Sequence, residues 1–381
     1  MSDEISPFRI EIPESEVDDL RRRLHAARFP EPLTEDDWSK GVPVAVLRRL
    51  ASAWIDFDWN SYQDRLNQIP QFTTEIDGQR IHFVHVRSQE SDAVPLLLTH
   101  GWPGSFLEFL ALIGPLTDPV AYGGDVADAF DIIIPSIPGF GFSTPLVSDN
   151  WPTRRIAEAW VTLMDRLGYD RFAVQGGDLG AGISPEVARV APDRVIGVHV
   201  NGTLGFGAEV DEATAATLTD LERDRLRRIR DFMQNEFGYI AIQSTRPHLV
   251  GELLTDSPVG QLAWILDKFQ AWTHPAQVPA EEIVGAEFLL ANASVYWFTA
   301  SAGSAASVGY AQHEWGDDPP SSGVPTAVIC FAHDIGIRRL VEDAHAITRW
   351  TDVPDRGGHF AALEEPEALV ADVREFLRPL R

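Results

Sequence analysis

The five residues Gly176-Gly177-Asp178-Leu179-Gly180 constrain the fold of this chain more than any other segment. The apolar run 171–175 precedes them and favours a buried strand, and the residues from Ala181 onward can begin a helix. Glycines around a reactive side chain are typical of the sharp strand-to-helix turn that presents a nucleophile at the edge of a sheet. The sequence therefore predicts that Asp178 is a nucleophile, at a place where esterases carry serine.

An aspartate at this turn supports a different chemistry from serine. A serine attacks acyl carbons, whereas a carboxylate can open an epoxide or displace a halide and leave an alkyl ester on the protein. Water must then cleave that ester, so a histidine base and an oxyanion hole are also required. The alternative interpretation of Asp178 is an ordinary turn residue, because Asp and Gly are common in turns.

Composition agrees with a globular protein and narrows the kinds of partner. The chain has 381 residues, of which 44% are hydrophobic, so it can bury a sizeable core. Its net charge of -26 argues against nucleic acid and anionic membranes as partners. No apolar stretch approaches the roughly 18 residues that a transmembrane helix needs, and residues 1–7 are not typical of a secretory signal. The single cysteine, Cys330, fits a reducing compartment, and we expect a cytoplasmic protein.

The order of helix-like and strand-like patterns divides the chain into four parts. Residues 1–68 favour an N-terminal helical meander, and residues 69–205 alternate apolar runs with helical patterns. Residues 206–322 are again helical, and residues 323–381 return to strands before a last helix. Alternation of this kind indicates a mostly parallel central sheet flanked by helices. We therefore predict an α/β-hydrolase fold whose two core parts enclose an inserted helical lid, over the sheet edge where such folds bind ligands.

Two further residues complete a candidate catalytic triad with Asp178. In this fold the nucleophile, the acid and the histidine follow one another along the chain. Asp334 comes directly after the strand-like run 326–331, and His359 follows the last strand. A loop of small residues lets the His359 imidazole approach a water molecule, while Asp334 would orient the ring and stabilise its charged form. The alternatives are a histidine that caps the last helix and a solvated acid beside His333.

An oxyanion hole needs two backbone N–H groups that face the developing charge. Leu179 supplies one, since it follows the nucleophile directly. The segment His100–Ser105 supplies the other through Trp102, and its Trp102-Pro103 bond is a candidate for a cis peptide. The alternative interpretation of this segment is a glycine-proline turn in which the Trp102 ring only fills space.

Neither a metal nor a cofactor is predicted. His82 and His85 lie three apart on a strand and so face opposite sides. The chain has no HExxH motif, and glycines such as Gly139 and Gly141 fit turns better than a dinucleotide-binding loop.

These segments together resemble the epoxide hydrolases of the microsomal and juvenile-hormone type, in their soluble microbial form. The resemblance spans nearly the whole chain. It is carried by Pro7–Ile10, Leu24–Pro32, Asp58–Trp59, Asn67–Asp77, His100–Ser105, Pro138–Ser143 and Gly357–Ala362. It implies a cofactor-free enzyme that converts an epoxide to a vicinal diol through an alkyl ester on Asp178.

The family also uses two lid tyrosines that hydrogen bond the epoxide oxygen and stabilise the leaving alkoxide. The resemblance places them at Tyr239 and Tyr296, and the alternative for each is a core aromatic residue with a satisfied hydroxyl. The chain departs from the family at two places. Leu179 stands where tryptophan is usual, which is expected to widen the pocket, and residues 301–310 lack an arginine that is common in relatives.

Several alternatives stay open on the sequence alone. A haloalkane or haloacid dehalogenase would use the same triad of Asp178, His359 and Asp334 but would not need the tyrosines. A catalytically silent relative would need neither the triad nor the tyrosines. The expected partners are a small-molecule epoxide, apolar and bulky if Leu179 enlarges the pocket, and water. A homodimer is a family-level expectation. Roles in detoxification and in natural-product biosynthesis, such as enediyne pathways, are both compatible with the resemblance.

Overall fold

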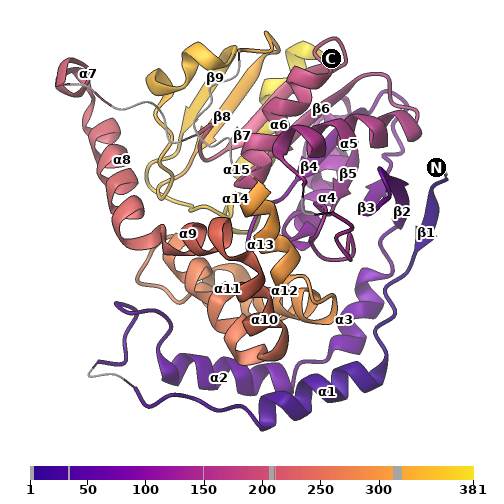
Figure 1. Cartoon of the computed structure of the whole chain (residues 1–381). Coiled ribbons are helices and arrows are strands. Elements are labelled where there is room, and N and C mark those ends of the chain that lie inside the picture. Colours follow the sequence, from indigo (N-terminus) through magenta and orange to yellow (C-terminus); the bar gives the residue numbers. More distant parts are fainter. Residues whose placement is uncertain (1–3, 33–34, 149, 206–209, 211, 312–319) are drawn as a thin grey trace.

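The computed structural model describes residues 4–32, 35–148, 150–205, 210, 212–311 and 320–381. In this part of the chain a nine-stranded sheet has the order β1-β2-β3-β5-β4-β6-β7-β8-β9 (Figure 1). The strands are β1 (Ser6–Phe8), β2 (Gln71–Ile76), β3 (Gln79–Val86), β4 (Val94–Thr99), β5 (Phe130–Pro135), β6 (Phe172–Gly176), β7 (Val195–Asn201), β8 (Thr326–Cys330) and β9 (Ile347–Asp352).

The sheet is antiparallel at one end and parallel through the rest. Strands β1, β2, β3 and β5 pair antiparallel, whereas β5, β4, β6, β7, β8 and β9 pair parallel in that order. Asp77 and Gly78 join β2 to β3 with φ of 52° and 76°, the two left-handed residues that a tight hairpin turn requires. The prediction of a mostly parallel α/β-hydrolase sheet is confirmed.

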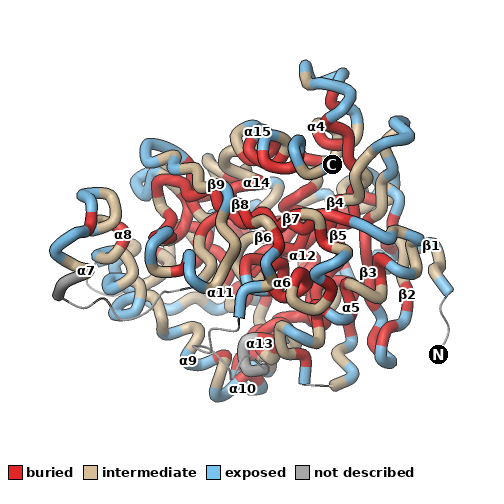
Figure 2. Tube along the Cα trace, turned by 90° about the horizontal axis from the view of Figure 1, so that it is seen from above, coloured by how far each residue is buried: buried red, intermediate tan, exposed pale blue. Residues whose placement is uncertain are grey.

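Helices cover both faces of the sheet, because consecutive strand residues point to opposite sides. On β4, Leu97 packs into the core with α5 (Thr153–Arg166) and α6 (Leu179–Val190). Its neighbours Leu96 and Leu98 pack into the core with α4 (Leu110–Thr117) and α15 (Pro366–Leu377). Figure 2 shows these central strands buried between the two helical layers.

Seven α-helices lie between β7 and β8 in the described residues, with two short π-helical segments among them. They are α7 (Glu212–Thr217), α8 (Asp220–Asp231), η4 (Phe232–Glu236), α9 (Gly238–Thr245), α10 (Pro247–Asp256), α11 (Pro258–Trp272), η5 (Glu281–Gly285), α12 (Ala286–Phe298) and α13 (Ala302–Ala311). Figure 1 shows this lid packed beside one end of the sheet.

The N-terminal helices α1 (Glu14–His25), α2 (Val44–Ile55) and α3 (Trp59–Leu66) run along the outside of the lid (Figure 1). The buried indole of Trp54 donates to Ser294 Oγ on α12 over 2.8 Å. Arg23 pairs with Asp256 on α10 at 3.1 Å. These contacts fix the lid to the N-terminal segment as well as to the sheet.

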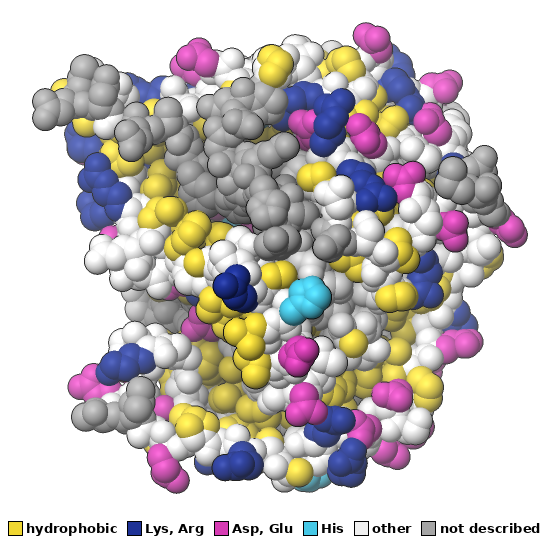
Figure 3. All heavy atoms as spheres, viewed as in Figure 1, with side chains coloured by type: hydrophobic (Ala, Val, Ile, Leu, Met, Phe, Trp, Pro, Cys, Tyr) yellow, Lys and Arg dark blue, Asp and Glu magenta, His cyan; other side chains and the backbone are white. Residues whose placement is uncertain are grey.

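The surface carries charges of both signs. Figure 3 shows acidic and basic side chains interspersed with hydrophobic ones over the face that it presents. Within the described residues no single helix has the length and apolarity to cross a membrane. The helix pair Glu281–Phe298 and Ala302–Val308, bent by 91°, meets that test only when its two members are joined.

Candidate active site

The turn between β6 and α6 raises the Asp178 carboxylate above the sheet. Asp178 has φ 54° and ψ -121°, a conformation that residues with a side chain rarely adopt. The chain can make this turn because Gly180 packs against β4, where an added Cβ would lie 2.0 Å from the Thr99 carbonyl oxygen. The predicted nucleophile therefore stands on a strained turn that the neighbouring strand fixes in place.

His359 faces the nucleophile across a short gap. Its Nε2 lies 3.2 Å from Oδ2 of Asp178. The loop is held on both sides, because the His359 N–H donates to the Trp272 carbonyl at 3.0 Å and the Phe360 N–H donates to Glu364 at 2.9 Å. The structure thus brings His359 and Asp178 together, and the role of His359 as the base that activates water stays a prediction.

Asp334 is buried in the turn after β8. Its Oδ2 accepts the Phe331 N–H at 2.7 Å. Burial raises the pKa of Asp334 to about 6, against the lowering effects of the Phe331 hydrogen bond and the charge of His359. The described residues contain no hydrogen bond between the Asp334 and His359 side chains, so in this arrangement the acid acts on the imidazole through its charge.

Two arginines of the lid helix α8 hold the Asp334 turn from outside. Arg228 donates to the Asp334 carbonyl at 2.9 Å. Arg225 is buried, with only 2% of its surface exposed. It donates to the Gly336 carbonyl at 3.0 Å and pairs with Asp352 at 2.6 Å. The position of Asp334, the predicted catalytic acid, thus depends on the lid as well as on the sheet.

The charges around His359 favour its protonated form in the resting enzyme. Burial acts against a charged imidazole, but the hydrogen bond and charge of Asp178 outweigh it, with help from Asp334. The pKa of His359 is therefore raised above its ordinary value. Esterification of Asp178 would remove the largest favourable contribution, which would leave the imidazole better able to act as a base.

One of the two predicted oxyanion donors is in contact with Asp178. The Trp102 N–H donates to Oδ1 of Asp178 at 2.8 Å, and the Trp102-Pro103 bond is cis, as predicted. Leu179 begins α6 directly after Asp178 and is half-buried against the core. The role of the Leu179 N–H as the second donor stays a prediction.

Tyr239 lies next to this donor loop. Its ring stacks on Trp102, with centroids 4.8 Å apart and an interplanar angle of 12°. Burial, Asp178 and Glu236 raise the pKa of Tyr239 well above its ordinary value, so its proton is retained. No described residue hydrogen bonds its hydroxyl, which leaves that group available to a ligand.

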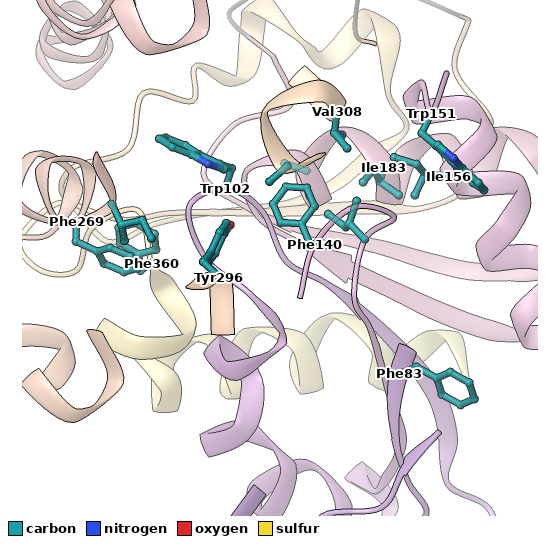
Figure 4. Packing of buried hydrophobic residues seen from close by; sticks show 14 of the residues in the cluster. Phe83, Trp102, Phe140, Trp151, Ile156, Ile183, Phe269, Tyr296, Val308 and Phe360 are labelled. Carbon is teal, nitrogen blue, oxygen red and sulfur yellow. The ribbon is translucent and has the colours of Figure 1, made fainter. Parts of the chain in front are cut away.

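Tyr296 differs from the expectation for a second proton donor. Its buried hydroxyl donates to the Gly104 carbonyl at 2.9 Å, and its ring packs near Phe140 (Figure 4). A hydroxyl has one proton to donate. In this arrangement Tyr296 therefore anchors the oxyanion loop to helix α12 and does not present a free donor.

A small cavity lies between the triad and the oxyanion loop. Asp178 and His359 both line it, together with two polar residues that the sequence analysis did not single out, Glu108 and Asn201. Glu108 carried a signal, since it is a charged residue inside the apolar run 106–113 that follows the oxyanion segment. Asn201 ends β7, where parallel strands place functional side chains.

His82 and His85, the two histidines weighed as metal ligands, have partners of their own. His82 is within 2.9 Å of Ser136 Oγ and 3.0 Å of Gln71, and His85 lies 2.9 Å from the Tyr169 hydroxyl. Among the described residues no three His, Cys, Asp or Glu side chains form a group that could hold a metal ion.

Comparisons with known proteins agree in fold and family. The family "Epoxide hydrolase N terminus" matches residues 5–109, and the family "alpha/beta hydrolase fold" matches residues 94–366. A protein of Stigmatella aurantiaca, named provisionally as an epoxide hydrolase, is 42% identical over 99% of this chain and 86% of its own length. Epoxide hydrolase 1 of Oryctolagus cuniculus is 34% identical over 98% of this chain and 88% of its own length.

A solved structure gives the same result. The juvenile hormone epoxide hydrolase of the silkworm Bombyx mori superposes with a TM-score of 0.89 at 30% identity, over 99% of this chain and 95% of that one. The fold and the Asp178–His359 pair define an α/β hydrolase with a carboxylate nucleophile. The comparisons make the assignment specific: the chain belongs to the epoxide hydrolase family, as the resemblance implied.

Proposed function

We propose that this epoxide hydrolase converts an apolar epoxide to a vicinal diol in two steps, through an alkyl ester on Asp178. One observation carries the proposal. The two carboxylate oxygens of Asp178 have different surroundings, since Oδ1 accepts the Trp102 N–H at 2.8 Å and Oδ2 faces His359 at 3.2 Å. One oxygen is thus held as the future oxyanion, and the other is left to react.

In the first step Oδ2 of Asp178 attacks a ring carbon of the epoxide and the ring C–O bond breaks. The alkoxide that leaves takes a proton from Tyr239, whose raised pKa keeps that proton until strong negative charge develops nearby. The free hydroxyl and the stacking on Trp102 support this role for Tyr239. Tyr239 then recovers a proton through the solvent, balanced by the proton that His359 releases once esterification of Asp178 lowers the pKa of the imidazole.

In the second step His359 removes a proton from a water molecule whose oxygen attacks the ester carbonyl carbon. Negative charge collects on Oδ1, where the N–H groups of Trp102 and Leu179 stabilise it. Asp334 stabilises the imidazolium by its charge. The tetrahedral intermediate then releases the diol, which takes the proton from His359. The remaining proton of the attacking water, left on the Asp178 carboxyl group, passes to His359, which restores the carboxylate and the protonated imidazole of the resting enzyme.

Aromatic rings of the lid and of the oxyanion loop support the proposal of an apolar substrate. Trp102, Tyr239 and Trp272 form a cluster of aromatic rings beside the nucleophile, with centroid separations of 4.8 to 6.3 Å. Leu179 offers a smaller side chain than the tryptophan usual in the family, so we include bulky epoxides among the proposed substrates. Detoxification and natural-product tailoring both use such chemistry, and the breadth of the accepted substrates would distinguish them.

Diol formation from a panel of aryl and alkyl epoxides by the wild type and by Asp178→Ala tests the proposal. Turnover by the wild type alone is expected. Equal turnover by both proteins would contradict the mechanism. Halide release from haloalkanes by the wild type, without diol formation, would favour the dehalogenase alternative.

We also propose a cellular location, a range of partners and an oligomeric state for this enzyme. A cytoplasmic location is supported by the single cysteine, Cys330, which is buried and needs no oxidising compartment. The net charge of -26 disfavours nucleic acid and anionic membranes as partners. A homodimer is proposed from the family resemblance, and sedimentation at several concentrations tests it.

A further inference from the structure

Glu108 is a buried carboxyl group beside the candidate active site, and no described lysine or arginine pairs with it. It lies in the short 3-10 helix η1 (Phe106–Phe109), whose other residues are apolar and buried. The residue is only 9% exposed and lines the same small cavity as Asp178 and His359. A hydrogen bond from the Ser105 backbone offsets only part of the cost of burying this acid, since its pKa stays raised, so its presence here calls for a function.

The oxyanion loop makes the space that Glu108 occupies. A Cβ added at Gly104 would lie 1.3 Å from Oε1 of Glu108, so only glycine at this position admits the carboxyl group. Tyr296 fixes the same residue from the other side by donating to its carbonyl oxygen at 2.9 Å. The loop that carries the Trp102 donor therefore also sets where the Glu108 carboxyl lies.

A comparison within the chain argues against a purely structural acid. Glu186 has the same exposed fraction, 9%, but pairs with Arg154 at 3.1 Å and Arg189 at 3.2 Å. Among the residues that the structure describes, no lysine or arginine pairs with Glu108. The cationic group that acts on it is His359.

The electrostatics of the cavity keep Glu108 protonated near neutral pH. Its pKa is raised to about 8, mainly by burial and also by the charge of Asp178, against the lowering effects of His359 and of a hydrogen bond from the Ser105 backbone. A protonated carboxyl group offers both an acceptor oxygen and an O–H donor. It can therefore bind a water molecule without adding a second negative charge beside the nucleophile.

We propose that Glu108 is a further catalytic residue, which binds the hydrolytic water in this cavity and orients it for attack on the ester at Asp178. One water hydrogen points to Nε2 of His359 and the other to a carboxyl oxygen of Glu108, so a lone pair of the water oxygen faces the ester carbon. When the new C–O bond forms, the proton passes to His359 and Glu108 keeps its own. This role rests on the two-step mechanism proposed above.

The two half-reactions test this role when they are measured separately. Rapid-quench mass spectrometry of the peptide that contains Asp178, after mixing enzyme with one epoxide, gives the rates of ester formation and ester decay. Glu108→Leu removes the water ligand, whereas Glu108→Gln keeps a neutral acceptor of similar shape. Glu186→Gln is the matched control, an equally buried acid outside the cavity.

In Glu108→Leu we expect ester decay to slow by about 10²-fold, the usual effect of a misplaced reactant. Ester formation should stay near the wild-type rate, so the ester accumulates on Asp178. Glu108→Gln should decay much faster than Glu108→Leu, and Glu186→Gln should match the wild type in both steps.

Three results would overturn the assignment. Ester decay in Glu108→Leu at the wild-type rate would exclude a role in hydrolysis. An equal loss in both half-reactions of Glu108→Leu and Glu108→Gln would show a structural role. Absence of any ester, even in His359→Gln, would instead remove the two-step mechanism itself, and this assignment with it.

Discussion

The Trp102 N–H donates to Oδ1 of Asp178 over 2.8 Å, so one oxyanion donor is in place before any substrate binds. Only Oδ2, on the His359 side, remains to attack the epoxide. In the proposed mechanism we therefore expect this donor not only to stabilise the later intermediate but also to decide which carboxylate oxygen becomes part of the product.

That distinction can be followed with isotopes. In a single turnover in ¹⁸O-labelled water, with enzyme in excess, the diol should carry no label and the label should appear in Asp178. Repeated turnovers in the same water should then label the diol, which serves as the control. Labelled diol in the first turnover would mean that water attacks the epoxide directly. Mass spectrometry of the diol and of the Asp178 peptide measures both.

Replacement of the base should separate the two steps. His359→Gln leaves Asp178 and Trp102 in contact, so ester formation should continue. Ester decay should fall by about 10² to 10⁴-fold, the range for loss of a general base. The expected observation is a stable mass increase on Asp178 equal to the mass of the epoxide. If the ester turned over normally, another base would have to be sought.

The two lid tyrosines should differ in their effects. Tyr239→Phe removes a free proton donor and should slow ester formation by about 10²-fold or more. Tyr296→Phe removes a hydrogen bond to Gly104 and should cost about 1 kcal/mol of stability, with a smaller effect on ester formation. The same substitution at Tyr310, the remaining lid tyrosine in the sequence, shows whether a second donor comes from α13. Equal decreases in the rate of ester formation in Tyr239→Phe and Tyr296→Phe would instead support the prediction that both tyrosines donate a proton.

The pKa of His359 should respond to the charge of Asp178. The resting enzyme holds that pKa above about 6.5, and the largest favourable contribution comes from the nucleophile. In Asp178→Ala this contribution is lost and burial remains, so the pKa should fall. Asp178 is also uncharged in the ester, so the pKa of His359 should fall there too. Ester hydrolysis should therefore continue at pH values below the pKa that His359 has in the resting enzyme. Histidine NMR titration of the wild type and Asp178→Ala measures the shift, and an unchanged value would contradict the coupling.

A stability effect is expected far from the active site, at Asp372 on α15. Burial opposes its ionisation, but hydrogen bonds from His199, Arg349 and Thr351 outweigh that effect and hold its pKa well below the usual range. A carboxyl group with a lowered pKa stabilises the fold above its unfolded pKa of about 4, and this stabilisation is lost as the pH falls below that value.

Asp372→Asn should therefore lower the free energy of unfolding by about 3 kcal/mol near neutral pH, with a smaller difference in acid. Glu375→Gln is the control, since Glu375 also pairs with Arg349 but is exposed, and it should cost less than about 1 kcal/mol. Denaturant unfolding at several pH values measures both variants. Equal stabilities of the wild type and Asp372→Asn would contradict this account.

Features set by neighbouring residues could be predicted from the sequence, whereas contacts between distant segments could not. The turn at Asp178 follows from local glycine spacing, and the hairpin at Asp77-Gly78 from a two-residue pattern. The hydroxyl of Tyr296, in contrast, bonds to a carbonyl 192 residues away. No periodicity in α12 could reveal that partner, and the resemblance alone suggested a different role.

The contacts made by Glu108 also join segments that are distant in the sequence. Its position in an apolar run was visible in the sequence, but the cavity that it shares with His359 exists only once residues 251 positions apart meet at the sheet edge. The pairing of Arg228 with the Asp334 turn is equally non-local. Long-range packing against the lid thus accounts for most of what the sequence analysis missed.

The attachment of helix α8 to the Asp334 turn limits how this enzyme can be re-engineered. Arg225 and Arg228 reach from the lid to the backbone that carries the acid, and Tyr296 reaches from the lid to the oxyanion loop. A lid grafted from a relative to change specificity would sever all three contacts at once. Functional chimeras should therefore be those whose donor lid supplies equivalent arginines and an equivalent tyrosine, whatever the shape of its pocket.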